Sequence, residues 1–592
     1  MTPLNNNSGN DGSTPEQPRL EQAPTGMVAG RDVTAYNQNQ SAFFCLPDES
    51  KTMIIRYLGF RDITRLVKVC KYFRDLVENH KALERAWYQR FPSPHLYQLK
   101  TIATTKDEQQ LRDWLKPFAN KDTVESLVKK QQSTYFPALL LFNNSKLMSQ
   151  CETFNLVTKT EITHPYHILI ATLSADSRHL VTVCLDGIVK ICSQETDGSW
   201  KVKASTPDNG WVQKAIFSTD NRHVLVVSRL RARIYGMNED GSWEAKANIS
   251  HNPWIISAIT SADGRHVVIA SLDNTLKIYG QKIDGSWEAK YIVNCDASTR
   301  LASFSADGRH LLVVNTSDVA TFYGLENDGS LEAKATIADP GGVNWACLSS
   351  DGRHALIRFR PNTLKIYGRE AGSWKVKTTI NHNNFANSYS FSDDCRHLAT
   401  ASSNNTAKIF DLQDDGSWKE ITTVSHNHFF YSLKFSADSR RLMTGSDDIT
   451  VKIYGQETPG SWVEEATIKH DERIISTGFS ADSRHLVTAS YDKTAKIYGR
   501  EAGGSWVKKA TIVHKDWVRS ATFSADGCLV VTASKDNTAQ IYGLGKDGSW
   551  VKKATLVHDR AVISVTFCAD GRHLVTTSED YKVRITELWK ND

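Results

Sequence analysis

From Cys151 to the end of the chain, apolar and polar residues alternate with the period of two that is typical of β-strands. The stretch 504–543 shows the pattern clearly, and it predicts strands over 506–513, 517–523, 530–534 and 538–542. Turn residues stand between the strands, among them Asp526-Gly527. Four short strands recur about every 43 residues, which predicts the blade of a β-propeller.

Ten aspartates mark this repeat, each in a variant of the phrase that reads best over 479–490. Their spacing is 43 or 44 residues: Asp176, Asp220, Asp263, Asp307, Asp351, Asp394, Asp438, Asp482, Asp526 and Asp570. A further strand is predicted over 152–162, and it supplies the outer strand that the last repeat lacks. We therefore expect one closed ring of ten blades, with two smaller rings or an open arc as alternatives.

The first 150 residues follow other patterns. Residues 1–40 are rich in Asn, Gly, Ser, Pro and Gln, which predicts a disordered tail. Apolar residues at helical spacing then predict a small helical domain over 41–92 and a helical linker over 93–150. One or two linker helices are expected within 106–132, broken at Pro117. The propeller is expected to occupy 151–592.

Composition narrows the possible functions. The 592 residues are 40% hydrophobic and carry a net charge of +5, a weak excess that predicts neither nucleic acid nor a membrane as partner. The ten cysteines have no metal-ligand spacing, and a reduced intracellular compartment fits them. Phosphate-loop, zinc-protease, hydrolase and kinase motifs are missing from the sequence. We expect no catalytic residues, no cofactor and no metal.

The repeated phrase resembles the WD repeat over about residues 153–589, with Tyr-Gly where that family has Trp-Asp. The resemblance implies a mainly β fold, a WD-type propeller of about ten four-stranded blades preceded by a small all-α domain. It also implies a buried hydrogen-bond network of His, Asp and an aromatic residue, in which a tyrosine hydroxyl would replace the indole donor. The matching sets are His251, Asp273 and Tyr279; His426, Asp448 and Tyr454; His470, Asp492 and Tyr498; and His514, Asp536 and Tyr542.

Other repeats depart from that network. Leu230, Ser317, Pro361 and Asn404 take the place of the turn aspartate, and Cys192 and Thr586 take the place of the tyrosine. A second histidine follows most of the ten landmark aspartates, for example His485 after Asp482. Because a catalytic group is needed once in one asymmetric pocket, this recurrence favours a structural role and argues against a hydrolase or lyase.

The position nine residues before each landmark aspartate is predicted to lie on one rim of the ring. Aromatic residues and arginine are typical of protein-binding surfaces, so we expect this rim to bind a target protein. Packing between blades is the alternative for these side chains. The residues concerned are Trp211, Trp254, Phe385, Phe429, Arg473 and Trp517, with Arg300 and Arg519 near the central opening.

The predicted helical domain resembles the F-box. Leu46-Pro47-Asp48-Glu49, Tyr57-Leu58 and Val69-Cys70-Lys71 follow one another at that family's spacing. The resemblance implies docking on a Skp-type adaptor through Leu46, Pro47, Ile55, Leu58, Ile63, Leu66 and Val69. The alternative is a helical bundle that packs only against its own chain.

Together the two resemblances imply a substrate-recognition subunit of an SCF-type (cullin–RING) ubiquitin ligase, without catalytic chemistry of its own. Its F-box would hold the Skp-type adaptor and the cullin core, its propeller would hold a target protein, and it would reside in the cytoplasm or nucleus. The alternatives are a WD-repeat scaffold, or a bacterial effector that uses ubiquitination in the host cytoplasm, as the close likeness of the repeats suggests.

Overall fold

The computed structural model describes residues 108–115, 119, 121–129, 148 and 151–590, the last range with short gaps between strands. The tail predicted at 1–40 and the helical domain predicted at 41–92 lie outside these residues. Within the predicted linker, helix α6 spans Glu108–Leu115 and helix α7 spans Lys121–Val128. Arg112 joins them, because its Nε lies 3.1 Å from the Glu125 carboxylate.

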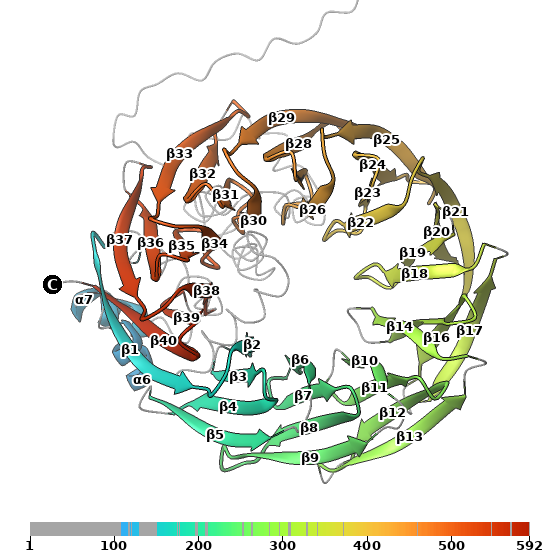
Figure 1. Cartoon of the computed structure of the whole chain (residues 1–592), viewed down its shortest axis with the longest axis horizontal. Coiled ribbons are helices and arrows are strands. Elements are labelled where there is room, and N and C mark those ends of the chain that lie inside the picture. The colour runs from blue at the N-terminus through green and yellow to red at the C-terminus, as the bar shows by residue number, and fades with distance from the viewer. Residues whose placement is uncertain are drawn as a thin grey trace, which may run out of the picture. The chain divides into compact units, whose positions relative to one another are not determined.

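The rest of the described chain forms ten antiparallel four-stranded sheets, which we number as blades 1 to 10. In blades 1 to 9 the first strand lies nearest the centre of the ring and the last strand lies at its outer edge (Figure 1). Blades 1 to 5 contain β2 (Ile168–Leu173), β3 (His179–Cys184), β4 (Ile188–Gln194) and β5 (Trp200–Pro207); β6 (Val212–Phe217), β7 (His223–Ser228), β8 (Arg231–Met237) and β9 (Trp243–Ser250); β10 (Ile255–Thr260), β11 (His266–Ser271), β12 (Thr275–Gln281) and β13 (Trp287–Asn294); β14 (Thr299–Phe304), β15 (His310–Asn315), β16 (Val319–Leu325) and β17 (Leu331–Ala338); and β18 (Val343–Leu348), β19 (His354–Phe359), β20 (Thr363–Glu370) and β21 (Ser373–Asn381).

Blades 6 to 9 repeat this arrangement, and blade 10 completes it with a strand from the other end of the propeller sequence. Their strands are β22 (Ala386–Phe391), β23 (His397–Ser402), β24 (Thr406–Leu412) and β25 (Trp418–Ser425); β26 (Phe430–Phe435), β27 (Arg441–Ser446), β28 (Thr450–Thr458) and β29 (Ser461–Lys469); β30 (Ile474–Phe479), β31 (His485–Ser490), β32 (Thr494–Arg500) and β33 (Trp506–Val513); β34 (Val518–Phe523), β35 (Leu529–Ser534), β36 (Thr538–Leu544) and β37 (Trp550–Val557); and β38 (Val562–Phe567), β39 (His573–Ser578) and β40 (Lys582–Lys590), with β1 (Phe154–Thr163) as the outer strand of blade 10.

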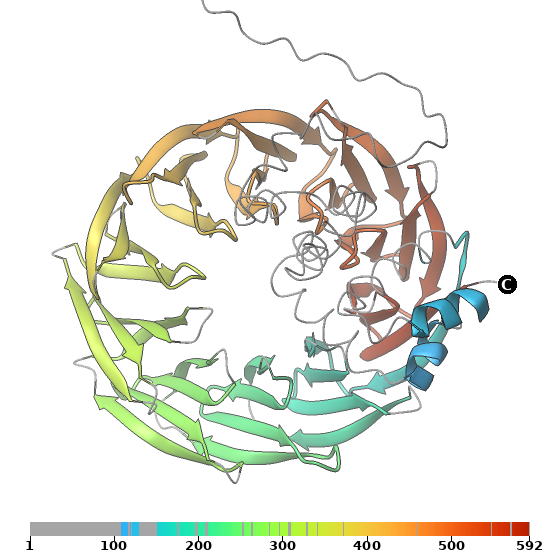
Figure 2. The same cartoon turned by 180° about the vertical axis from the view of Figure 1, so that it is seen from behind.

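Pairing of β1 with β40 closes the ring. The two strands are antiparallel, with Phe154 opposite Lys590 and Thr163 opposite Lys582. The closure is visible from both sides of the ring (Figure 1, Figure 2). The prediction of one ring of ten blades is therefore confirmed, and the alternatives of two rings or an open arc are wrong. Ten blades exceed the four to eight that most propellers have.

The hydrophobic core is divided among the junctions between blades. Each of the ten junctions holds one cluster of buried side chains from the two facing sheets. Between blades 7 and 8, for example, Met443 and Ile453 pack against Ile474 and Leu486. Each fully buried aliphatic side chain contributes roughly 1.5–3 kcal/mol, so every junction stabilises both blades that form it.

The recurring aspartates are turn residues. In blade 8 the Ser480 hydroxyl donates to Asp482 Oδ1 at 2.6 Å, and the Arg484 amide donates to the same oxygen at 3.0 Å. Ser483 between them has a φ of 57°, which a tight turn requires. Equivalent bonds hold the turns at Asp176, Asp220, Asp351, Asp394, Asp438 and Asp526, whereas Asp263, Asp307 and Asp570 lie outside the described residues.

Candidate functional site

Among the residues that the structure describes, three blades carry a complete histidine network near the rim. In blade 8, His470 Nε2 lies 2.8 Å from the Thr488 hydroxyl and His470 Nδ1 lies 2.7 Å from Asp492 Oδ2. The Asp471 amide donates to the same aspartate oxygen at 3.1 Å, so the network ties the loop before β30 to the turn after β31. His426 with Thr444 and Asp448, and His514 with Thr532 and Asp536, repeat these contacts at 2.8–2.9 Å.

The electrostatics of these sets favour neutral histidine beside ionised aspartate. Burial lowers the pKa of His426, His470 and His514 and outweighs the neighbouring carboxylate. Burial alone would raise the pKa of Asp492, but hydrogen bonds from Thr494, the Asp471 amide and His470 lower it. Since each polar atom is fixed by a neighbour in the fold, the arrangement can stabilise a loop and a turn at the same time.

The fourth predicted set is described only in part, and the predicted tyrosines face the junctions between blades. His251 lies outside the described residues, and Asp273 accepts bonds from the Thr275 amide and hydroxyl. The Tyr454 hydroxyl donates to Glu464 at 3.5 Å, because its strand position faces the junction between blades rather than His426. Tyr279, Tyr498 and Tyr542 likewise pack against the interblade clusters.

Three further buried histidines have incomplete networks. His164 and His382 contact the hydroxyls of Thr182 and Thr400 at 2.8 and 3.0 Å, but their Nδ1 atoms are buried without a hydrogen-bond partner among the described residues. Burial lowers the pKa of both to about 4. In blade 10, burial and the neighbouring Arg584 together lower the pKa of His558 to about 4.

A contact between tryptophan and histidine recurs from blade to blade, and sequence reasoning missed it. The tryptophan that opens an outer strand meets the histidine that opens the second strand of the preceding blade, edge to face. The ring centres of Trp243 and His179 are 5.3 Å apart, and the same contact joins Trp287 to His223, Trp418 to His354, Trp462 to His397 and Trp550 to His485 at 5.3–5.6 Å. The signal was present in the sequence, because both residues recur with the repeat. These histidines therefore contribute to interblade packing.

Asp411 strengthens this contact at the junction of blades 6 and 7. Its buried carboxylate lies 2.7 Å from His397 Nδ1 and accepts a bond from the Trp462 indole at 3.2 Å. The Gln456 amide donates to its second oxygen at 3.2 Å. In blade 1, Ser193 has the same role, contacting His179 at 2.8 Å and accepting from Trp243 at 3.0 Å.

The aromatic residues predicted on the rim are all partly exposed. The Arg229 guanidinium lies 4.8 Å from the centre of the Trp254 ring, and the Arg358 guanidinium lies 4.2 Å from that of Phe385. The Trp517 ring contacts both the Tyr491 ring and the Lys535 amine at 4.5 Å. Phe429 contacts the His428 ring at 4.8 Å, and Trp211 is more than half exposed. The three predicted arginines form ion pairs: Arg300 with Asp318 at 3.1 Å, Arg473 with Asp447 at 3.0 Å and Arg519 with Glu579 at 2.8 Å. Most of these contacts cross from one blade to its neighbour.

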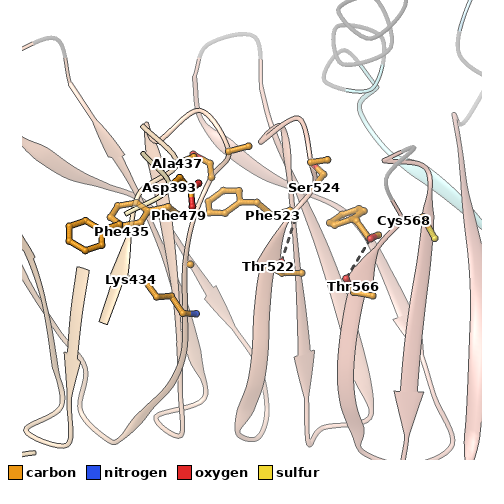
Figure 3. Close-up of a pocket in the computed structure, with 15 residues that line it drawn as sticks. Asp393, Lys434, Phe435, Ala437, Phe479, Thr522, Phe523, Ser524, Thr566 and Cys568 are labelled. Atoms are coloured by element: carbon orange, nitrogen blue, oxygen red, sulfur yellow. Dashed lines mark hydrogen bonds between the residues drawn. The ribbon is translucent and has the colours of Figure 1, made fainter. Parts of the chain in front are cut away.

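A cavity of about 360 Å³ lies at the opposite end of the innermost strands, and residues of blades 6 to 10 line it. Phe435, Phe479 and Phe523 line it in sequence along the wall, and Lys434 and Asp393 lie at one end (Figure 3). Lys434 donates to the Thr477 carbonyl at 2.9 Å, and burial lowers the pKa of its amine. The Lys434 amine is therefore already hydrogen bonded to the backbone of β30.

Among the described residues no cluster of His, Cys, Asp or Glu has the arrangement of a metal site. None of the helices in this part of the chain is long and apolar enough to cross a membrane. The residues expected to bind the adaptor, Leu46, Pro47, Ile55, Leu58, Ile63, Leu66 and Val69, lie outside the described ranges.

Two family models match the chain. The F-box domain model matches residues 43–85, and the WD domain, G-beta repeat model matches 374–411, 418–455, 463–499, 506–543 and 550–587. A search of curated proteins finds no match. Similar solved structures include Sqt1 from Saccharomyces cerevisiae (12% identity, TM-score 0.38) and Sqt1 from Chaetomium thermophilum (13%, 0.37). Each match covers 57% of this chain and 96% of the other, and a likeness this low says nothing about function. The chain thus combines an N-terminal F-box with a C-terminal ten-bladed propeller of WD-type repeats, the architecture of an F-box/WD-repeat protein.

Proposed function

We propose that this protein is a substrate-recognition subunit of an SCF-type ubiquitin ligase. The observation that carries the proposal is the presence of an F-box at 43–85 and a closed WD-type propeller in one chain. An F-box implies binding to a Skp-type adaptor, and a propeller offers a rigid rim on which a second protein can be held.

The mechanism is positional. The F-box would dock on the adaptor and cullin core while the rim holds the target, so that the target's lysines meet the ubiquitin-loaded enzyme at high effective concentration. Short tethers of this kind give effective concentrations in the millimolar range. Propellers in this architecture are typically non-catalytic, and the histidine–aspartate pairs described above are used in holding turns and blades together.

Adaptor capture tests the proposal. Replacing Pro47 and Leu58 with aspartate puts charge on the apolar face expected to dock, and burying an unpaired carboxylate in such an interface costs several kcal/mol. We expect the double variant of the full chain to lose the Skp-type adaptor in co-purification, whereas the wild-type chain retains it. A matched control, Trp254→Ala, changes an exposed rim side chain and should retain the adaptor fully.

A double variant that still co-purifies with adaptor would contradict this function and favour a WD-repeat scaffold. A second readout separates the two directly, since a ligase subunit with bound adaptor also brings down the cullin whereas a scaffold does not. The origin of the chain, including a bacterial effector acting in host cytoplasm, does not alter these outcomes.

A further inference from the structure

The rim of blades 1 to 3 carries six exposed apolar side chains. We call it the blade 1–3 patch. Its members, with the exposed fraction of each, are Tyr166 (53%), Leu185 (40%), Trp211 (55%), Leu230 (51%), Trp254 (50%) and Leu272 (39%). Contiguous exposed apolar surface on a folded protein marks an interaction site more often than it serves folding.

Backbone hydrogen bonds hold the patch in place. The Leu185 amide donates to the His167 carbonyl at 2.9 Å and the Leu272 amide donates to the Trp254 carbonyl at 3.0 Å, so each turn is tied to the loop beside it. The Ile255 amide donates to the Arg229 carbonyl at 2.7 Å and joins blade 2 to blade 3. A surface fixed in this way loses little conformational entropy when a partner binds.

Arg229 and Arg231 flank Leu230 of the patch. Arg229 lies over the Trp254 ring at 4.8 Å, and neither Arg229 nor Arg231 forms an ion pair with a carboxylate among the described residues. On blades 4, 8 and 9, Arg300, Arg473 and Arg519 each pair with an acidic side chain. Elsewhere on the rim, Arg358 and Lys535 lie over aromatic rings as Arg229 does. The blade 1–3 patch therefore offers apolar contact beside two arginines, and the exposed carboxylate of Asp186 lies in the turn that carries Leu185.

We propose that this patch is where the propeller binds its target, and that the bound segment presents large apolar side chains next to carboxylates. The inference rests on the function proposed above and specifies the part of the rim that performs it. Trp211 and Trp254 would act as anchors, since a half-exposed tryptophan gains the most buried area on binding. Arg229 and Arg231 would select acidic neighbours of the apolar residues and raise the rate of association.

A peptide selection tests the proposal without requiring the natural target. The probe is a phage-displayed library of random dodecapeptides, selected on the full-length chain. We expect enriched peptides to combine Leu, Ile, Phe or Trp with Asp or Glu.

A synthetic fluorescent peptide from the enriched set then gives a dissociation constant by anisotropy. Trp211→Ala with Trp254→Ala should weaken it roughly 10- to 100-fold. Arg229→Ala with Arg231→Ala should weaken it several-fold and reduce its dependence on salt.

The matched control is Phe429→Ala with Trp517→Ala, two exposed aromatic residues on blades 7 and 9 of the same rim, and it should leave affinity within about twofold. Equal melting temperatures for all variants show that the fold is intact. The proposal is overturned if no peptide is enriched, if the enriched peptides lack apolar or acidic residues, or if the control variant rather than the patch variant loses binding. The adaptor-capture experiment is independent of the peptide selection. If the wild-type chain fails to capture the adaptor, the ligase function is rejected. If the peptide experiment fails, only the location of the target site is rejected.

Discussion

Replacing Arg584 with leucine is expected to lower the free energy of unfolding of the ring by about 3–5 kcal/mol, because it leaves a buried carboxylate unpaired. The Arg584 side chain is 9% exposed and lies 3.0 Å from Asp580, whose side chain is 7% exposed. The same guanidinium lies 2.9 Å from Glu161 on the closing strand β1 and 3.2 Å from Asp559. One substitution thus removes an internal ion pair of blade 10 and a link across the closure of the ring.

The measurement is the urea midpoint of the full chain, together with hydrogen exchange of the β1 amides. We expect faster exchange in β1 before any other outer strand, because β1 is the one strand of the ring held from a distant part of the sequence. The control is Arg473→Leu, which removes an ion pair with Asp447 whose arginine is 57% exposed and should cost less than about 1 kcal/mol. Equal losses in the two variants would show that Arg584 does not secure the closure.

Stability is expected to fall steeply as the pH is lowered from 7 to 4. His164, His382 and His558 are buried, and each has a folded-state pKa of about 4, whereas histidine in an unfolded chain has a pKa near 6.5. Between these values the unfolded chain binds protons that the folded chain does not, so falling pH favours unfolding. The stability lost is on the order of 3 kcal/mol for each group by the time the pH reaches the folded-state pKa.

The check is the melting temperature at several pH values between 7.5 and 4.5. Glutamine at positions 164 and 382 retains a group that can hydrogen bond to Thr182 and Thr400 but cannot take up a proton. The double variant should therefore show a flatter profile than the wild-type chain. His428→Gln, at an exposed position, is the control and should follow the wild-type profile. A double variant as sensitive to acid as the wild-type chain would place the cause elsewhere.

The blades could be predicted almost completely from sequence, because a period of two within a period of about 44 leaves few other folds. The strand predicted over 506–513 is β33, and the predicted closing strand over 152–162 is β1 with its ends shifted by one or two residues. Turn residues also identified the loops, since Asp and Gly at the turn have a local chemical reason to be there. The helices expected within 106–132 correspond to α6 and α7.

The contacts between blades were harder to predict, because they join residues with no local relation. Trp462 and His397 are far apart in the chain, and only the curvature of the ring brings their side chains together. For the same reason the sequence indicated aromatic rim residues but not which of them are covered by neighbours. Trp517 contacts Tyr491 and Lys535, whereas Trp211 is more than half exposed. Burial at a rim depends on the adjoining blade, and a repeat considered by itself does not contain that information.

The division of the hydrophobic core into ten equivalent junctions has a consequence for the length of the chain. Every junction uses the same strand positions. Deleting a segment as long as one repeat, wherever it starts, therefore leaves two partial repeats that together make one intact blade. The closing pair β1 and β40 would still meet, provided that each remaining junction turned through a slightly larger angle. Adding one period would require a slightly smaller angle. The diameter of the central opening could therefore be changed by whole-repeat deletion or duplication, while the register of each individual blade stayed as it is.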